Sequence, residues 1–268
     1  QNKDGRKAAA AYGLCGVYQK TKNPIEQLHF ALWLAGAEPS DSIHTNAAQI
    51  GDQSIYWAVS GFDLGLLLDS EASIPQLEEF VQRYPNVKDV RRVKYALAVR
   101  LSRENRYQEA ADLYRSIAAV RRTPRLRRLA TLYGETQRTD AIAQQLATAK
   151  YQAAEFLSQN SDRIYFNDDL WHGFQTAALY GAEDSRLTRS EHEAASARER
   201  QLKDQQEELW RAAQLLQEVV KDAGPTDLGR KAARLAIQCL RRINVGRFGR
   251  EDEIRTADIQ LSKWLLQR

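Results

Sequence analysis

The most constraining stretch of this chain is residues 93–117, VKYALAVRLSRENRYQEAADLYRSI, which has the pattern of two helices joined by a tight turn. Small and apolar residues fall on one face of each predicted helix, where two packed helices must touch. A helical pair of this kind cannot bury its apolar faces alone, so it predicts further helices stacked on either side. The positions are Leu97, Ala98 and Leu101 in the first helix, Asn105, Arg106 and Tyr107 in the turn, and Ala110, Tyr114 and Ile117 in the second helix.

These positions resemble a repeat of the tetratricopeptide-like (TPR-like) helical-repeat superfamily, whose members mostly bind other proteins. Lys94 stands where the family usually has Trp, and Pro124 comes two residues later than the terminal Pro of the repeat. The resemblance implies a right-handed α-α superhelix, or solenoid, of antiparallel helical hairpins. It also implies a non-catalytic scaffold, a subunit that binds protein partners through its helical surface.

The composition predicts an all-α fold. There are only 14 Gly and 6 Pro among 268 residues, while the helix formers Ala, Leu, Arg, Gln and Glu are abundant. No stretch alternates apolar and polar residues for long enough to predict a sheet. We expect a single helical-repeat domain over residues 1–268. It has a possible subdivision near 160, into a TPR-like stack over 1–160 and a long helix plus a C-terminal helical pair over 161–268.

Helix starts are marked by Ser, Thr or Asn ahead of Pro, Glu or Gln, whose side-chain oxygens can accept from the first backbone N–H groups. Such caps are predicted at Asn23, Ser73, Thr123 and Thr188. With these starts, helices are predicted over residues 4–20, 23–36, 53–68, 74–84, 88–104, 107–119, 124–136, 138–160, 168–181, 188–223, 227–244 and 250–267.

The sequence predicts no membrane insertion. The longest apolar run, residues 30–37, is far shorter than the roughly 20 residues that span a bilayer. The first residues lack the apolar core of a signal peptide. A chain that starts with Gln fits a processed, exported bacterial protein, so a periplasmic or otherwise exported location is favoured over a cytoplasmic one.

Charge is concentrated in residues 83–128, which we call the basic island. It holds 14 Lys or Arg against 4 Asp or Glu, a net charge of +10, so the remainder of the chain carries −6 to give the overall +4. Within the island, the cluster of Arg121, Arg122, Arg125, Arg127 and Arg128 straddles a loop and the following predicted helix start, whose free N–H groups add to the attraction for an anion. The candidate partner-binding residues are Arg91, Arg92, Arg121, Arg122, Arg125, Arg127 and Arg128.

Three interpretations of the basic island remain open. Its charges can be solvated and paired with acidic side chains or helix C-termini. They can form a docking face for a protein with an acidic surface, because the planar guanidinium of Arg matches carboxylates. They can also bind the phosphates of nucleic acid, although aromatic residues for base stacking are sparse and no nucleic-acid motif is present.

A second candidate contact region is the long predicted helix 188–223. Its second half carries a heptad-like seam that can pack along a neighbour. Its first half is polar nearly all round, so residues 188–203 are either plainly exposed or project towards a partner. The seam consists of Leu202, Leu209 and Leu216, interleaved with Gln206, Ala213 and Val220.

No catalytic residue, cofactor or metal site is predicted. The histidines lack metal-ligand spacing, and the two cysteines are expected to be buried thiols rather than a disulfide. A further alternative is the helical arm of a larger enzyme such as a lytic transglycosylase, whose α-superhelical region this chain resembles; the catalytic domain would then lie in further sequence. The histidines are His29, His44, His172 and His192, and the cysteines are Cys15 and Cys239.

Overall fold

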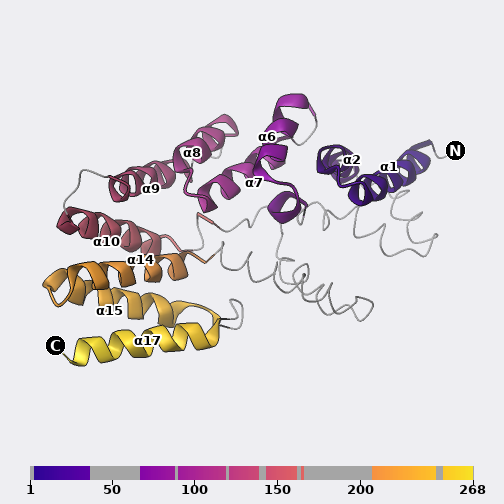
Figure 1. The fold of residues 1–268 in the computed structure, drawn as a ribbon. Coiled ribbons are helices and arrows are strands. Elements are labelled where there is room, and N and C mark those ends of the chain that lie inside the picture. Colours follow the sequence, from indigo (N-terminus) through magenta and orange to yellow (C-terminus); the bar gives the residue numbers. More distant parts are fainter. Residues whose placement is uncertain are drawn as a thin grey trace. The chain divides into compact units, whose positions relative to one another are not determined.

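All regular elements that the structure describes are helices, as the composition predicts (Figure 1). The computed structural model describes residues 3–36, 67–87, 90–118, 121–138, 143–161, 164–165, 207–245 and 250–267. No strand occurs in these ranges. None of the helices within them is both long and apolar enough to cross a membrane.

The chain divides into two compact units, and the division falls inside one helix, after Arg100. The first unit comprises residues 1–100 and 167–184, and the second comprises residues 101–166 and 185–268. The expectation of a single repeat domain with a subdivision near 160 stays a prediction.

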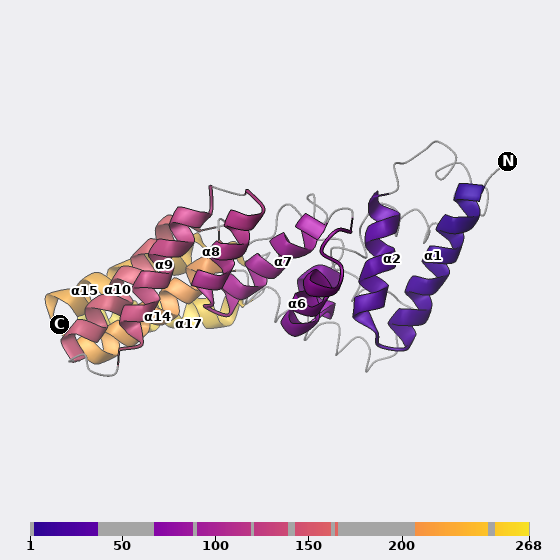
Figure 2. The ribbon, with the colours of Figure 1, turned by 90° about the horizontal axis from the view of Figure 1, so that it is seen from above.

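In the first unit, α2 is the central described helix, because it contacts α1, α6 and the short turn η1 (Figure 2). Its Leu28 and Leu32 are buried, and Leu77 and Phe80 of α6 are buried too. The elements are α1 (Lys3–Lys20), α2 (Pro24–Gly36), η1 (Leu67–Glu71), α6 (Ile74–Arg83) and most of α7 (Val90–Arg103).

Two predicted caps of this unit are confirmed. The Asn23 side chain accepts from the N–H of Glu26 (3.4 Å) ahead of α2. At the start of α6, Ser73 and Gln76 form a reciprocal capping box, with bonds of 3.3 and 2.8 Å. Of the predicted helix 53–68, only the end lies within the described residues, where residues 67–71 form a π-helical turn rather than an α-helical end.

The second unit is a row of helices in which each contacts the next described one in the chain (Figure 1). Alanines such as Ala212, Ala213, Ala232 and Ala233 are fully buried and let α14 and α15 approach closely. Lys150 of α10 reaches α14 and pairs with Glu218 (2.8 Å). The helices are α8 (Tyr107–Ser116), α9 (Thr123–Thr136), α10 (Ala143–Gln159), α14 (Glu208–Ala223), α15 (Asp227–Arg242) and α17 (Glu251–Leu266).

The turn between α7 and α8 is close to its prediction. Asn105 adopts a φ of +63°, and the N–H of Arg106 donates to the carbonyl of Leu101 (2.9 Å), which closes a tight turn. Tyr107 is the first residue of α8 rather than part of the turn. Ala110 and Tyr114 are fully buried, as the pattern requires.

Two other predictions concern α14. The turn after it contains Gly224 at a φ of +57°, between the predicted helices 188–223 and 227–244. Of the predicted helix 188–223, only residues 208–223 form a helix within the described ranges. The seam positions Leu209, Ala213, Leu216 and Val220 are buried there, whereas Leu202, Gln206 and the projecting segment 188–203 lie outside the described residues.

A buried carboxylate organises the second unit. Glu208, in the first turn of α14, is only 1% exposed. One of its oxygens accepts hydrogen bonds from the backbone N–H groups of Ile164 and Tyr165, each at 2.7 Å. Hydrogen bonds to a carboxylate are stronger than those between neutral groups. Glu208 therefore holds residues 164–165, more than 40 positions away in the sequence, against the start of α14.

Two arginines extend this network to the end of α7. Arg103 is buried and donates to the carbonyl of Tyr165 (3.0 Å). The guanidinium of Arg211 lies 4.5 Å from the centre of the Tyr165 ring and donates to the side chain of Asn105 (3.1 Å). It also donates to the carbonyl of Arg103. The Tyr165 segment is therefore held by charged groups from α7 and α14.

Three tyrosines complete the network. The hydroxyls of Tyr107 and Tyr165 are 2.5 Å apart, and the ring of Tyr107 lies 5.0 Å from that of Tyr133. Burial raises the pKa of all three phenols above the ordinary value of 10.0. The cluster connects α8, α9 and the segment around Tyr165.

We expect Glu208→Ala to lower the free energy of unfolding by roughly 2–5 kcal/mol, since each buried N–H left without an acceptor costs about 1–3 kcal/mol. Glu208→Gln keeps one carbonyl acceptor and should lose less. Urea denaturation followed by circular dichroism measures both. Glu79→Ala, at an exposed position of α6, is the control and should stay within about 0.5 kcal/mol of the parent. A loss at Glu208→Ala no larger than the control's would contradict the assignment.

The tyrosines predict a steep loss of stability in alkali. Their raised pKa values mean that the folded state keeps phenol protons that the unfolded chain releases above about pH 10. The stabilisation is therefore fully present below pH 10 and is lost as the pH rises beyond it. Each buried tyrosine contributes a slope of about 1.4 kcal/mol per pH unit in this range. Tyr133→Phe should make the slope, measured by denaturation at several alkaline pH values, shallower by up to that amount, because the pKa of Tyr133 is raised by burial; an unchanged slope would contradict the raised pKa.

Candidate binding surface

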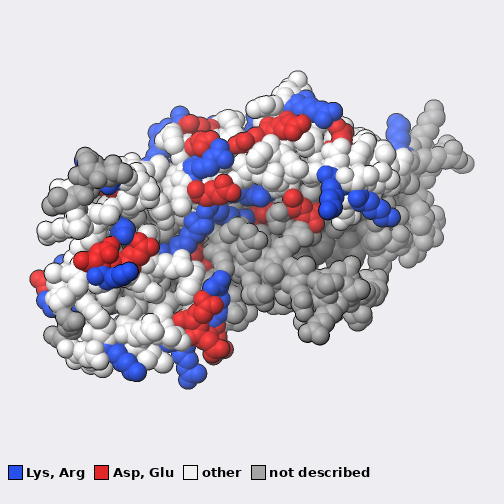
Figure 3. All heavy atoms as spheres, viewed as in Figure 1, with Lys and Arg blue, Asp and Glu red and all other residues white. Residues whose placement is uncertain are grey.

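Much of the basic island is engaged in contacts within the protein. Arg83 pairs with Glu26 (3.0 Å), and Arg106 pairs with Glu109 (2.7 Å) and lowers the pKa of that carboxyl through their hydrogen bond. Arg115 also pairs with an acid one turn away, Asp112. These side chains support the interpretation of a solvated, paired surface. On the face shown in Figure 3, basic and acidic side chains likewise lie next to one another in most places.

Four arginines at the start of α9 lack an acidic partner among the described residues, as does the exposed Arg91 in the first unit. No ion pair links them to any acid in the described part of the chain. Three are exposed and one, Arg125, is half-buried. We call this set the α9 arginines: Arg121, Arg125, Arg127 and Arg128. They belong to the cluster that the sequence singles out, and they are its unpaired part.

The local sequence of α9 explains why these side chains face outward. Leu126, Leu129 and Leu132 recur every third residue and are buried, which fixes the inner face of the helix. Arg125 and Arg128, three residues apart, lie one above the other beside that face. Like charges at this spacing repel one another by a few tenths of a kcal/mol, so the arrangement does not stabilise the helix.

The predicted cap at Thr123 is wrong. The helix begins at Thr123 itself, Arg122 takes the N-cap position, and no side chain caps the helix. The Thr123 hydroxyl is instead buried without a partner among the described residues. Since Pro124 has no N–H, the first turn keeps its positive end with fewer donors than a typical helix start.

The seven predicted partner-binding arginines do not all share one unit. Arg121, Arg122, Arg125, Arg127 and Arg128 lie together at the start of α9 in the second unit, while Arg91 and Arg92 lie at the start of α7 in the first unit. Within the α9 group, Arg122 is distinct, because its guanidinium donates to the hydroxyl of Tyr114 (3.5 Å).

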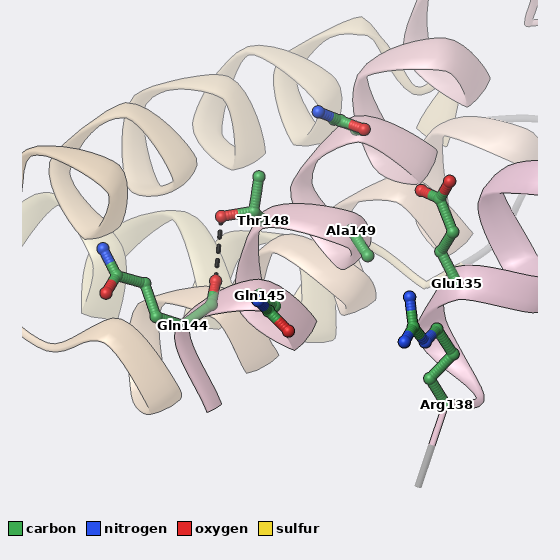
Figure 4. A pocket seen from close by; sticks show the side chains of 7 residues that line it. Glu135, Arg138, Gln144, Gln145, Thr148 and Ala149 are labelled. Carbon is green, nitrogen blue, oxygen red and sulfur yellow. Dashed lines mark hydrogen bonds between the residues drawn. The ribbon is translucent and has the colours of Figure 1, made fainter. Parts of the chain in front are cut away.

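A polar pocket of about 610 Å³ lies between the end of α9 and the first half of α10 (Figure 4). On one side of it lie two charges of opposite sign, Glu135 in the last turn of α9 and Arg138 just beyond the end of that helix. On the other side α10 supplies amide and hydroxyl groups, with Ala149 as the apolar member of the lining. The α10 residues with polar side chains are Gln144, Gln145, Thr148 and Gln152.

Sequence reasoning missed this pocket. The signal available to it was the recurrence of Gln144, Thr148 and Gln152 at intervals of four, which places uncharged polar groups along one side of a helix. Such a pattern in the sequence does not by itself indicate a pocket, because the opposite wall comes from a neighbouring helix. The pocket therefore emerges only from the packing of α9 against α10.

The described residues contain no group of three or more His, Cys, Asp or Glu side chains that could hold a metal ion. His29 is half-buried, with its ring 4.6 Å from that of Tyr84. Cys15 is half-buried and Cys239 is buried, both as free thiols, and burial raises the pKa of the Cys239 thiol to about 11. That thiol is therefore protonated at neutral pH and unsuited to nucleophilic chemistry. The other three histidines, His44, His172 and His192, lie outside the described residues.

No protein-family model matches the chain, and no curated protein or solved structure is significantly similar to it. The resemblance of residues 93–117 to a tetratricopeptide repeat consequently stays a prediction.

Because the α9 arginines are unpaired, we expect their removal to leave the fold intact. Arg121→Gln, Arg125→Gln and Arg128→Gln combined should change the free energy of unfolding by no more than about 0.5 kcal/mol, or raise it by relieving repulsion. Urea denaturation of the triple variant beside the parent measures this. A loss of several kcal/mol would mean that these side chains support the fold instead of a contact.

Proposed function

We propose that this chain is a non-catalytic scaffold of TPR-like, solenoid character, which binds a protein partner with an acidic surface through the α9 arginines. The observation that carries the proposal is the contrast within the basic island. Arginines such as Arg83, Arg106 and Arg115 have acidic partners within the chain, whereas those of α9 have none among the described residues. Neighbouring cations that repel one another attract a partner with an acidic surface, and this attraction also raises the rate of association.

The arrangement of helices in the second unit supports the scaffold part of the proposal. Its described helices contact one another in chain order, from α8 to α17. A repeat stack has this nearest-neighbour character and presents long helical surfaces to partners.

The surroundings of the α9 arginines favour protein over nucleic acid. The aromatic residue of α9 is Tyr133, whose ring is half-buried in the tyrosine cluster rather than presented beside the arginines. Single-stranded nucleic acid is usually held by exposed aromatic rings on which bases stack, in addition to cations. Carboxylates need only the planar guanidinium groups.

The test is affinity purification of the full chain from a lysate of its source organism, followed by mass spectrometry. One variant carries Gln at Arg121, Arg125, Arg127 and Arg128. A control variant carries Gln at four arginines with acidic partners in the same unit, Arg106, Arg115, Arg230 and Arg241, and so loses the same net charge. We expect a defined set of proteins with the parent and the control, and its loss from the α9 variant.

Retention of the same proteins by the α9 variant would contradict the proposal, and so would an equal loss from both variants, which would indicate a general effect of net charge. Recovery of nucleic acid alone, released steeply by added salt, would favour the nucleic-acid interpretation instead.

A further inference from the structure

The polar residues on one side of α10, Gln144, Thr148 and Gln152, form what we call the polar row. Their side chains suit a surface that hydrogen-bonds to a peptide backbone. Each glutamine offers both donors and an acceptor, as a peptide group does. The side chains of Gln144, Gln145 and Gln152 are exposed and are not engaged in hydrogen bonds with described residues. The hydroxyl of Thr148 donates to the carbonyl of Gln144 (2.8 Å; Figure 4), which leaves its oxygen able to accept.

The spacing of the row matches an extended chain. Gln144, Thr148 and Gln152 recur every four residues, which corresponds to a rise of about 6 Å along a helix. An extended peptide repeats every two residues, at about 6.7 Å. Successive polar groups of α10 can therefore meet successive peptide groups that point the same way, over a length of about two such repeats.

The pocket also leads towards the α9 arginines. Arg128 precedes the pocket residue Glu135 by seven residues, nearly two helical turns, so both lie on one side of α9 about 10 Å apart. Because α10 runs back along α9 (Figure 1), Gln152 is the end of the row directed towards Arg128. A chain lying in the pocket thus passes from amide groups to unpaired cations.

We propose that the pocket between α9 and α10 holds an extended peptide segment, whose backbone hydrogen-bonds to the polar row and whose acidic side chains lie against the α9 arginines. This inference rests on the proposed function and names the segment of the partner that the surface takes. Charge complementarity selects the occupant: the unpaired cations adjoin the Gln152 end of the row, while Glu135 and Arg138 supply one charge of each sign at the end of α9. A small apolar ligand fits poorly, because such ligands need a mainly hydrophobic lining.

The experiment uses the full chain and two fluorescent, end-capped decapeptides, with three glutamates at the N-terminal or C-terminal end and alternating threonine and serine elsewhere. Binding is followed by fluorescence anisotropy. A second version of each peptide is N-methylated at alternate residues of the uncharged tract, which removes backbone donors and leaves the charge unchanged. The pocket variant is Gln144→Ala with Gln152→Ala. Its control is Gln214→Ala with Gln260→Ala, at exposed positions of α14 and α17.

We expect one of the two peptides, the one with its glutamates at the matching end, to bind the parent and the control variant with equal affinity. N-methylation and the pocket variant should each weaken binding roughly fivefold or more, as expected for the loss of backbone hydrogen bonds. The α9 arginine variant should weaken it as well.

Equal affinity of the N-methylated peptide or of the pocket variant would overturn the inference, and so would failure of both peptides to bind. If the arginine variant alone loses the peptide, or if copurified proteins still depend on the α9 arginines, the proposed function stands without the pocket. If neither the pocket nor the arginines matter in either experiment, both proposals fall together.

Discussion

The second unit depends on one buried carboxylate. Glu208 accepts from two backbone N–H groups of the segment around Tyr165, and that segment is held in turn by Arg103, Arg211 and the hydroxyl of Tyr107. A buried charge is tolerated only when hydrogen bonds replace its hydration. The network therefore fixes the end of α7 and the starts of α8 and α14 in one arrangement, beside which α9 and α10 pack.

The arginines of the basic island have two different roles, contacts within the protein and exposed unpaired charge. Arg103 is buried and hydrogen-bonded in the interior, and Arg106 and Arg115 pair with acids of α8. On α9 the inner face is filled by leucines, and among the described residues no acid forms an ion pair with its outer arginines. The α9 arginines are thus an unpaired group within the island, and they adjoin the polar pocket through a shared helix.

Local features of the fold could be predicted from the sequence, because their partners lie within a few residues. The capping box of Ser73 and Gln76 is of this kind. The seam through Leu216 could be predicted for another reason, since its spacing alone marks the buried face of α14. The contact between Glu208 and Tyr165 could not, since a Glu in the first turn of a helix usually faces water. The sequence also placed the arginine cluster correctly on a helix start, but it could not separate paired from unpaired side chains, and the pocket needed two packed helices.

The most direct test of the account is amide hydrogen exchange of the full chain with and without polyglutamate, an acidic chain that carries no specific sequence. The account predicts slower exchange in residues 121–138 and in the first half of α10 when polyglutamate is bound, with α15 and α17 unchanged. Slowing spread over the paired arginines of α8 and α15, or no slowing at α9, would contradict the claim that the unpaired arginines form the binding surface.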